Sequence, residues 1–488
     1  MTTRTLTETM PEDDHFHDEC GVFGVYNHPD ASALTALGLH ALQHRGQEAA
    51  GVVSFGGKRF HSHRALGSVG DNFNSEDVID RLEGPMAIGH VRYSTSGGTV
   101  MRNVQPLFAD LVFGGFAIAH NGNLTNARKC RNDLVERGSI FQSTSDTETI
   151  LHRVATSEYR KVLDKLTDAL GGVEGAYSLV ALTRQKLIGV RDPSGVRPLV
   201  IGKIGDDGHV LASETCALDI IGAEYVRDVE PGEIVVFSEK GMQSLKPFPE
   251  QPSRFCIFEY IYFARPDSVI NGHNVYEVRK NIGKELARES LVEADMIVPV
   301  PDSGVPSAIG FAEESGIPFD LGIIRSHYMG RTFIQPSDNI RHLGVKLKHN
   351  ANRDWIKGKR LVLVDDSIVR GTTSVKIVEM MRNAGAAEVH MRISSPPTTH
   401  PCFYGIDTPD KDKLMASRMT VDEMAAHIGV DSLAFISYDG LYRAVGQNGR
   451  NDDMPQYCDA CFTGEYPIAL VDHEGGANGA QLTLLSEE

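Results

Sequence analysis

The chain has 488 residues, of which 41% are hydrophobic and 23% are charged, and its formal net charge is −17. This length predicts two or three domains with sizeable cores, and the negative charge argues against non-specific binding to nucleic acid or to an anionic membrane. Because no stretch approaches the ~18 uninterrupted apolar residues of a membrane span, and because residues 1–19 lack the apolar core of a secretory signal, we expect a cytoplasmic protein.

Residues 20–250 carry short alternating strand patterns separated by glycine-rich turns. Helical patterns interrupt the strands, which predicts an α+β domain with antiparallel sheets. The expected strands are CGVFGVYN, AAGVVSFG, MAIGHVRYST, FGGFAIAHNGNL, AYSLVALT, KLIGVRDP and GEIVVFS, and the expected helices are ASALTALGLHALQHRG, SDTETILHRVAT and EYRKVLDKLTDAL.

Residues 251–470 have a different pattern and predict a second domain. Buried strands alternate with helices here, which is typical of a parallel α/β sheet; the strands are MIVPVPDS, FDLGIIRS, RLVLVDDS and EVHMRISS. The polar, basic segment 331–353 has no clear period, and a long loop inside a compact domain predicts a lid. The glycine-rich, acidic segment 471–488 predicts a disordered tail.

Cys20 directly precedes a strand pattern, GVFGVY. Alone it is a weak signal, since most single cysteines behave as small hydrophobic residues. Four later segments strengthen it: HRGQEAAG (44–51), GHVRYST (89–95), HNGN (120–123) and TSDTE (144–148). In this order the segments resemble the class II glutamine amidotransferase domain, an N-terminal-nucleophile hydrolase with a four-layer α+β fold.

The resemblance covers about residues 20–250 and implies that residues 1–19 are a propeptide, so that the mature chain begins with the catalytic Cys20. A free α-amine has a pKa near ~8 and can act as the base for the thiol of the same residue. The resemblance further implies an oxyanion hole built from the side-chain amide of Asn121 and the backbone N–H of Gly122.

Two more residues are implied to bind glutamine, Arg92 at its α-carboxylate and Asp146 at its α-ammonium. Simpler interpretations exist for each position. Arg92 is also compatible with a surface strand residue, Asn121 and Gly122 with a hairpin turn, and Asp146 with a helix N-cap.

The run Leu361–Ser374, LVLVDDSIVRGTTS, is a buried strand ending in two adjacent carboxylates. A polar turn and a helical pattern, VKIVEMMRNAG, follow it. Backbone N–H groups at a helix N-terminus suit a phosphate, and the paired acids suit sugar hydroxyls or Mg²⁺. A plain strand with a polar loop is the alternative, and a Walker-type loop is excluded because no Gly-Lys-Ser/Thr is present.

This run resembles the phosphoribosyl-pyrophosphate (PRPP) signature of type I phosphoribosyltransferases. The resemblance implies that Asp365 and Asp366 contact the ribose hydroxyls, with Mg²⁺ held by these two residues and Ser303. The 5-phosphate is assigned to Arg370, Gly371, Thr372, Thr373 and Ser374. Pyrophosphate is assigned to the loop Pro301–Gly304, which contains Asp302 and Ser303, and to lid residues Arg331, Lys346 and Lys348, although a solvated basic loop is the alternative for the lid.

Seven cysteines in an intracellular chain suggest thiols, catalytic groups or metal ligands rather than disulfides. Cys458 and Cys461 form CDAC, Cys402 lies in PCFYGID, and Cys256 lies in RFCIFEYIYFARPDS. Four cysteines suit zinc or a [4Fe–4S] cluster equally well, and spacing does not decide between them. The remaining two, Cys130 and Cys216, match no motif and are expected to be structural thiols.

The combination of both domains resembles the amidophosphoribosyltransferase family of the iron–sulfur type, over about residues 1–470 and including the run FEYIYFARPDS. The resemblance implies a pentosyltransferase that uses glutamine and PRPP in the first step of purine synthesis, with ammonia channelled from Cys20. It also implies Mg²⁺, a [4Fe–4S] cluster on the four cysteines, feedback by purine nucleotides, and a homotetramer or dimer.

A non-enzymatic regulator and a different class II amidotransferase are the two alternative function classes. A non-enzymatic regulator that senses PRPP is expected to carry a nucleic-acid-binding module, which the composition and patterns do not indicate. Other class II amidotransferases, such as glucosamine-phosphate or asparagine synthetases, have different partner domains and lack the run VLVDDSIVRGTTS.

Overall fold

The computed structural model describes residues 20–93, 100–325, 349–408 and 410–473. These residues form two compact units that are not continuous in sequence. The larger unit contains the described residues of 20–278, 400–410 and 450–473, and the smaller unit those of 279–399 and 411–449. The predicted propeptide (1–19), most of the predicted lid, including Arg331, Lys346 and Lys348, and residues 474–488 of the predicted tail lie outside the described residues.

The two units divide the chain differently from a single boundary near residue 250. Segments 251–278, 400–410 and 450–470, which we assigned to the second domain, belong to the larger unit. Backbone pairing explains the difference, because β14 (Phe255–Cys256) and β23 (Tyr457–Cys458) form a parallel pair although about 200 residues separate them.

Two antiparallel sheets form the centre of the larger unit. The first has the strand order β11 (Glu224–Asp228), β9 (Val200–Ile204), β10 (Gly208–Ala212), β1 (Gly21–Tyr26), β4 (Met86–Arg92), β2 (Ala49–Phe55), β3 (Phe60–Leu66). The second has the order β13 (Gly241–Leu245), β12 (Ile234–Ser238), β8 (Leu187–Arg191), β7 (Gly175–Thr183), β6 (Gly114–Leu124), β5 (Leu107–Leu111).

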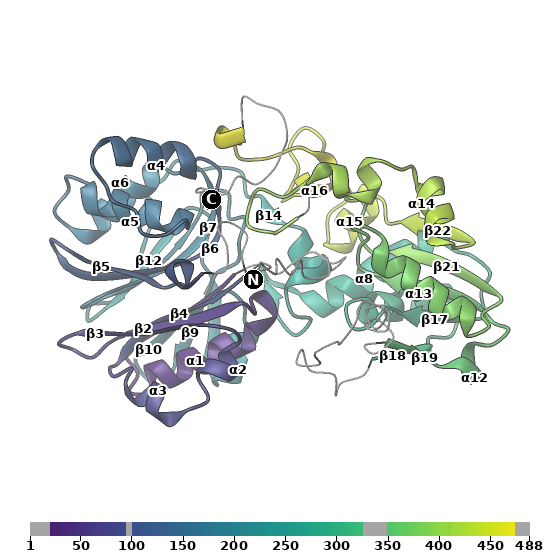
Figure 1. Ribbon diagram of the computed structural model, residues 1–488, viewed down its shortest axis with the longest axis horizontal. Helices are drawn as coiled ribbons and strands as arrows, with labels where there is room; N and C mark the ends of the chain where they lie inside the picture. The colour runs from purple at the N-terminus through teal and green to yellow at the C-terminus, as the bar shows by residue number, and fades with distance from the viewer. Residues whose placement is uncertain (1–19, 94–99, 326–348, 409, 474–488) are drawn as a thin grey trace, which may run out of the picture. The chain divides into compact units, whose positions relative to one another are not determined.

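Helices cover the outer face of each sheet (Figure 1). On the first sheet, α1 (Ala31–Ala41) packs closely, because Gly38 has no Cβ and a Cβ there would lie 2.4 Å from the ring of Phe23. α4 (Ala127–Glu136), α5 (Asp146–Thr156) and α6 (Val162–Gly171) lie on the second sheet. Apolar cores fill the space under each helix layer and between the sheets. The predicted four-layer α+β fold is confirmed.

The larger unit also contains short elements outside these layers. A π-helix, η3 (Glu259–Phe263), follows β14 within the run FEYIYFARPDS. The others are η1 (Gln43–Arg45), α2 (Val69–Asn72), α3 (Glu76–Asp80), η2 (Met101–Asn103), α7 (Cys216–Ile220), β15 (Val269–Ile270), β16 (His273–Asn274), α16 (Ala460–Thr463) and η6 (Val471–His473).

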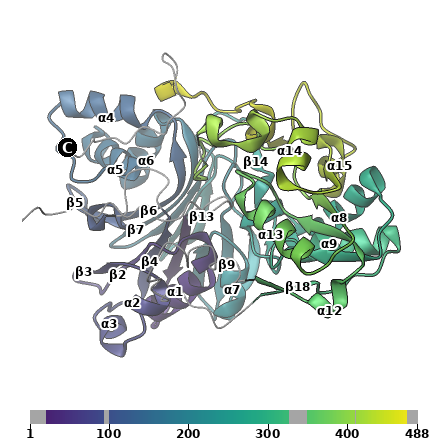
Figure 2. The ribbon, with the colours of Figure 1, turned by 45° about the vertical axis from the view of Figure 1, so that its right-hand side comes forward.

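The smaller unit is built on a parallel sheet, as predicted, with the order β17 (Met296–Pro299), β20 (Arg360–Asp365), β21 (Glu388–Ile393), β22 (Ser432–Phe435). α9 (Val305–Ser315) packs on β17 and β20, whereas α13 (Thr372–Asn383) and α14 (Val421–Ile428) pack on β21 and β22 (Figure 2). The other elements are α8 (Val275–Ser290), which begins in the larger unit, β19 (His349–Ala351), α12 (Arg353–Ile356), η4 (Lys411–Lys413), η5 (Met415–Ser417) and α15 (Tyr438–Ala444).

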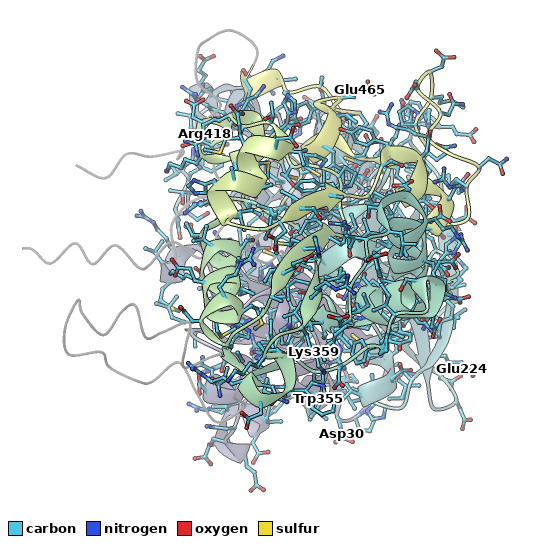
Figure 3. All side chains as sticks on the ribbon, turned by 90° about the vertical axis from the view of Figure 1, so that its right-hand side faces the viewer. Asp30, Glu224, Trp355, Lys359, Arg418 and Glu465 are labelled. Atoms are coloured by element: carbon cyan, nitrogen blue, oxygen red, sulfur yellow. The ribbon has the colours of Figure 1, made fainter. Side chains whose placement is uncertain are left out.

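One strand prediction was wrong. FDLGIIRS meets the parallel sheet through a single parallel bridge, between Phe319 and Ile297 of β17, and forms no full strand of it. Its β18 (Ile323–Arg325) pairs antiparallel with β19, and two of its three residues are exposed. Nearby, Trp355 of α12 donates from Nε1 to Asp320 (2.6 Å), and the Lys359 ammonium lies 4.4 Å from the Trp355 ring centroid (Figure 3). An apolar run shows that a segment is extended but does not specify the strand with which it pairs.

Candidate active sites

Cys20 lies immediately before β1, in the middle of the seven-stranded sheet, and is 5% exposed. β1 runs antiparallel to β4 with Gly21 opposite Val91, so the end of β4 lies beside Cys20. The Cys20 thiol donates to the carbonyl of Tyr93 (Sγ to O, 3.7 Å), and the Cys20 carbonyl accepts from Nε of Arg45 (3.2 Å). The side chain is therefore held in a buried position at a strand end.

Burial raises the pKa of the Cys20 thiol above its ordinary value, while the positive charge of Arg92 offsets part of this rise. A raised pKa keeps the thiol protonated near neutral pH. A nucleophilic role for Cys20 therefore requires a nearby base, as the amidotransferase resemblance implies.

Arg92 is the last residue of β4 and is 3% exposed, so its interpretation as a surface residue is wrong. The sheet register places it opposite Ala49 of β2. Because Val91 pairs with Gly21, Arg92 lies at the end of β4 next to Cys20, and its charge lowers the pKa of that thiol. A buried guanidinium beside a thiol provides a partner for a substrate carboxylate.

Asn121 and Gly122 lie inside β6, opposite Ser178 and Tyr177 of β7, so the hairpin-turn interpretation is wrong. The Asn121 side chain is fully buried, and neither its Oδ1 nor its Nδ2 has a hydrogen-bond partner within the part of the chain that the structure describes. Gly122 has φ +138°, and a Cβ there would lie 2.0 Å from the carbonyl oxygen of Ala176. Buried amides are normally paired, so Asn121 has the properties of a donor waiting for a ligand.

Asp146 is the first residue of α5, and the N-cap is Ser145, whose hydroxyl accepts from the N–H of Thr147 (3.3 Å). The N-cap interpretation of Asp146 is therefore wrong. Its Oδ2 accepts from the N–H of Leu124 (3.0 Å) and lies 3.6 Å from Nδ1 of His120. These contacts join α5 to the strand that carries Asn121.

Burial by itself raises the pKa of Asp146, but His120, the N–H of Leu124 and Arg92 outweigh it, and the pKa lies below its ordinary value. The carboxylate is thus charged at neutral pH and suits a substrate ammonium. The charges of Asp146 and Arg92 have opposite effects on Cys20, since Asp146 raises the pKa of its thiol and Arg92 lowers it.

Sequence reasoning missed three groups in this site. Arg45 lies in the quoted motif HRGQEAAG but received no role, although its Nε donates to Cys20. His120 lies in HNGN and contacts Asp146. Tyr93 contributes a backbone carbonyl, which no side-chain pattern could have revealed.

In the smaller unit, Asp365 ends β20 and Asp366 follows it, and both are buried. Asp366 accepts hydrogen bonds at both oxygens, from the hydroxyls of Ser303 and Ser367, each at 2.6 Å. Asp365 accepts from the backbone N–H of Asp366 (3.0 Å). Two candidate magnesium contacts, Ser303 and Asp366, are therefore adjacent, although 63 positions separate them in the sequence.

The candidate phosphate loop leads directly into α13, which begins at Thr372. Gly371 precedes the helix with φ +83°, so the N–H groups of the first turn, including Thr373 and Ser374, have the arrangement that binds phosphates. In the neighbouring loop Asp302 forms an ion pair with Arg325, a residue that sequence reasoning did not select.

The four candidate cluster cysteines all belong to the larger unit and come from three segments of the chain. Cys256 and Cys458 lie opposite each other in the β14–β23 pair. Burial raises the pKa of the Cys461 thiol well above its usual value, and the other three cysteines add to the rise. None of the four forms a disulfide.

The buried guanidinium of Arg197 interacts electrostatically with Cys256, Cys402 and Cys458. Among the described residues, no three His, Cys, Asp or Glu side chains converge on a position for one metal ion. A [4Fe–4S] cluster has a different geometric requirement from a site for one metal ion, because each cysteine binds a separate iron and the cysteine sulfurs lie further apart. Four thiols of the same unit, three of them buried and Cys402 half-buried, fit that requirement.

These two sites define a class of protein, a glutamine amidotransferase joined to a phosphoribosyltransferase. A family model for the glutamine amidotransferase domain matches residues 90–219, and one for the phosphoribosyl transferase domain matches residues 273–394. The amidophosphoribosyltransferase of Rhizobium etli is 57% identical over 486 residues, 98% of each chain. That of Bacillus subtilis is 49% identical over 455 residues, 93% of this chain and 95% of the relative. The chain belongs to the amidophosphoribosyltransferase family.

Two solved structures are similar over nearly the whole chain. One, described as the allosteric regulatory enzyme of purine biosynthesis, has a TM-score of 0.88 at 48% identity and covers 92% of this chain and 97% of its own. The other, the glutamine PRPP amidotransferase of B. subtilis complexed with ADP and GMP, has a TM-score of 0.87 at 48% identity, covering 92% and 98%. No helix in the described residues is both long enough and apolar enough to span a membrane.

Proposed function

We propose that the chain converts glutamine, PRPP and water into 5-phosphoribosylamine, glutamate and pyrophosphate, the first step of purine synthesis. The observation that carries the proposal is the presence of two different sites in one chain. One, in the larger unit, has Cys20 beside the end of β4, which carries the buried Arg92, together with the buried Asp146 and the buried Asn121, whose amide has no hydrogen-bond partner among the described residues. The other places paired carboxylates directly before a helix N-terminus.

In the glutamine reaction, Cys20 attacks the side-chain carboxamide after its thiol proton passes to the α-amine of the same residue. Asn121 Nδ2 and the Gly122 N–H donate to the developing oxyanion, ammonia leaves with that proton, and water then hydrolyses the thioester. Arg92 binds the α-carboxylate of glutamine and Asp146 its α-ammonium. The buried, unpartnered amide of Asn121 supports this assignment, since oxyanion donors act best when they are preorganised.

In the transfer reaction, Asp365 and Asp366 hold the ribose hydroxyls, and the loop from Arg370 to Ser374 holds the 5-phosphate. Ser303, Asp365 and Asp366 are the candidate contacts of Mg²⁺, which would neutralise charge on the pyrophosphate. Mg²⁺ in such sites is usually bound by one or two protein side chains together with oxygens of the substrate. The adjacent Ser303 and Asp366 are consistent with this coordination. Ammonia attacks C1 of PRPP and pyrophosphate departs.

The lid remains a proposal. Segment 331–353, with Arg331, Lys346 and Lys348, would neutralise departing pyrophosphate and exclude water while ammonia passes to C1. Most of this segment lies outside the described residues. The predicted removal of residues 1–19 has the same status.

Cys256, Cys402, Cys458 and Cys461 are proposed to hold a [4Fe–4S] cluster with a structural role. The burial of Cys256, Cys458 and Cys461, the pairing of Cys256 with Cys458 and the absence of disulfides among the four support the assignment. Feedback by purine nucleotides is also proposed, because a B. subtilis relative was solved with ADP and GMP. Homotetrameric assembly and a cytoplasmic location stay predictions.

The test of the glutamine site is Cys20→Ala. We expect this variant to lose glutamine-dependent activity and to keep activity with a high concentration of ammonia, because the transferase site needs only ammonia. The two activities are measured by PRPP-dependent pyrophosphate release. Retained glutamine activity would remove Cys20 from the reaction, and loss of both activities would refute an independent transferase site.

The test of the transferase site is Asp366→Ala. We expect both activities to be lost, because ribose binding precedes attack by either source of ammonia. Wild-type turnover of PRPP in this variant would exclude Asp366 from the site. Glutamine hydrolysis without PRPP serves as the control for an intact larger unit.

A further inference from the structure

A chain of buried charged side chains runs from Cys20 to the segment that carries Cys402. Its members are Arg45, Glu259 and Arg197, and their side chains are at most 1% exposed. All of these residues belong to the larger unit. Buried charges are costly to maintain, so a connected series of them calls for a functional explanation.

Arg45 forms the first link. Its Nε donates to the carbonyl of Cys20 (3.2 Å), and its terminal nitrogens contact Glu259 at 2.8 and 3.0 Å and Glu214 at 2.7 Å. Burial lowers the pKa of Arg45, but the two carboxylates outweigh this effect and the pKa ends above its ordinary value. The guanidinium is therefore charged and fixed in orientation on three sides.

Glu259 forms the second link and comes from the run FEYIYFARPDS, to which no role has yet been given. It begins the π-helix η3 and is fully buried. Its Oε1 contacts both Nη2 of Arg45 (2.8 Å) and Nη1 of Arg197 (3.3 Å). One carboxylate thus bridges two guanidinium groups, and π-helical turns often occur at functional positions.

Arg197 forms the third link, and its Nε donates to the carbonyl of Tyr404 (2.8 Å). The segment around Tyr404 reaches the oxyanion strand as well, since Asn123 Nδ2 donates to the carbonyl of Phe403 (2.9 Å). A Cβ on Gly405 would lie 2.9 Å from the Cα of Gly122. The segment 402–405 therefore contacts both Arg197 and the strand that carries Asn121.

We propose that Glu259 is a positioning residue of the glutamine reaction, which holds Arg45 against the Cys20 carbonyl and links that contact through Arg197 to the segment 402–405. The inference rests on the proposed role of Cys20. A chain that begins with Cys20 has no preceding residue to hold it, and the paired register of β1 begins one position later, at Gly21. The contact from Arg45 then restricts rotation about the Cα–C bond and so fixes the directions of the α-amine and the thiol.

Glu259→Gln tests this role because it keeps the shape of the side chain and removes its charge. We expect kcat with glutamine to fall roughly 10- to 100-fold, the usual cost of misplacing a reacting group by about 1 Å. The KM for glutamine stays within about twofold, since Arg92 and Asp146 still bind the substrate, and ammonia-dependent kcat is unchanged. Activities are expressed per chain whose N-terminus is Cys20, as determined by mass spectrometry.

Glu233→Gln is the matched control. Glu233 is also buried and forms a two-point pair with Arg227 at 2.7 Å for both contacts. Its other partners among the described residues, Ser244 and the N–H of Glu230, do not contact Cys20. A purely structural effect of removing a buried carboxylate would appear in both variants as lower thermal stability. Only Glu259→Gln is expected to change the ratio of glutamine-dependent to ammonia-dependent kcat.

Two outcomes would overturn the inference: an unchanged ratio in Glu259→Gln, or the same loss of ratio in Glu233→Gln. If Glu259→Gln does not accumulate as folded protein, Arg45→Lys replaces it, because lysine keeps the positive charge but cannot make the two-point contact with Glu259. A wild-type ratio of glutamine-dependent to ammonia-dependent kcat in Arg45→Lys would also overturn the inference. Cys20→Ala distinguishes a failure of the proposed nucleophile from a failure of the positioning role of Glu259. Glutamine activity in Cys20→Ala refutes the proposed nucleophile, whereas an inactive Cys20→Ala with a normal Glu259→Gln refutes only the positioning role.

Discussion

At the scale of single residues, the burial of the Asn121 amide has a cost in folding free energy that the fold alone does not explain. Burying an amide without partners destabilises a protein by about 1–3 kcal/mol. The side chain of Asn121 is in this state within the described residues, in the interior of β6 and beside Gly122, whose φ of +138° is readily adopted only by glycine. Such costs concentrate at functional sites, where a ligand supplies the missing partner.

Asn121→Ala is therefore expected to lower kcat with glutamine about 10²- to 10³-fold, as measured by glutamate release, because one oxyanion donor is lost. Thermal stability should not fall, since an unpaired amide is removed. Asn126→Ala is the control: Asn126 is a buried amide that donates to Gly172 and accepts from Glu174. That variant should lose stability and keep kcat, and the reverse pattern would contradict the oxyanion assignment.

Glu148 gives a prediction on pH. Burial tends to raise its pKa, but His152 and the N–H groups of Gln142 and Ser143 lower it to about 2. A carboxyl with a depressed folded pKa stabilises the fold fully above its unfolded pKa of about 4.5, and this contribution is lost as the pH falls toward about 2. The contribution supports the start of α5, where Asp146 lies.

Glu148→Gln is expected to lower the free energy of unfolding by on the order of 2 kcal/mol at pH 7, allowing for solvent screening. The difference from the wild type should shrink strongly at pH 3, where the wild-type carboxyl also loses most of its advantage. Urea unfolding at the two pH values measures it. Equal differences at both would show that Glu148 acts through packing rather than charge.

At the scale of elements, the phosphate loop depends on how α13 begins. Gly371 has φ +83°, and a Cβ there would lie 2.3 Å from Cε of Met415. A left-handed backbone costs other residues about 1–2 kcal/mol. The loop therefore keeps its shape only with glycine, and the shape sets the directions of the N–H groups at the helix start.

Gly371→Ala is expected to raise the KM for PRPP about tenfold, with glutamine hydrolysis unchanged, because the N–H groups of the loop move. Gly429→Ala is a closely matched control, since Gly429 has the same φ of +83° at the end of α14 and a Cβ there would meet nothing within 4 Å. Steady-state kinetics with PRPP distinguish the two variants. A similar rise in KM in Gly429→Ala would show that general strain, not the phosphate loop, is responsible.

At the scale of the whole molecule, the larger unit is assembled from three separate stretches of chain. The β14–β23 pair joins two of these stretches, and the contact between Asn123 and Phe403 joins a third. The four candidate cluster cysteines lie in the same three stretches. A cluster bound by them would cross-link the unit, and its loss would loosen those contacts together.

Exposure to oxygen is therefore expected to remove visible absorption, iron and sulfide together, and to lower the thermal midpoint of the protein. Anaerobic protein should contain about four irons and four sulfides per chain. Cys130→Ser is the control, because Cys130 is a buried thiol outside the four. Zinc in place of iron and sulfide, or unchanged stability after metal loss, would contradict the proposed structural cluster.

The sequence determined the features that depend on neighbouring residues. A short continuous apolar run followed by two acids, a polar turn and a helical pattern was sufficient for β20, Asp365, Asp366 and α13, because local backbone preferences control them. The motifs around Cys20 indicated the four-layer fold through their resemblance to class II glutamine amidotransferase domains. Cys20, Asn121 and Asp146 were selected on the same basis.

Only the tertiary structure decided which distant groups meet in the interior. The antiparallel partner of β18 and the chain from Arg45 through Glu259 to Arg197 join residues that are far apart in sequence. No periodicity encodes such contacts, because they depend on burial and on the packing of whole layers. The sequence alone thus determined the two chemistries of this protein, and the fold decided which charges hold Cys20 in place.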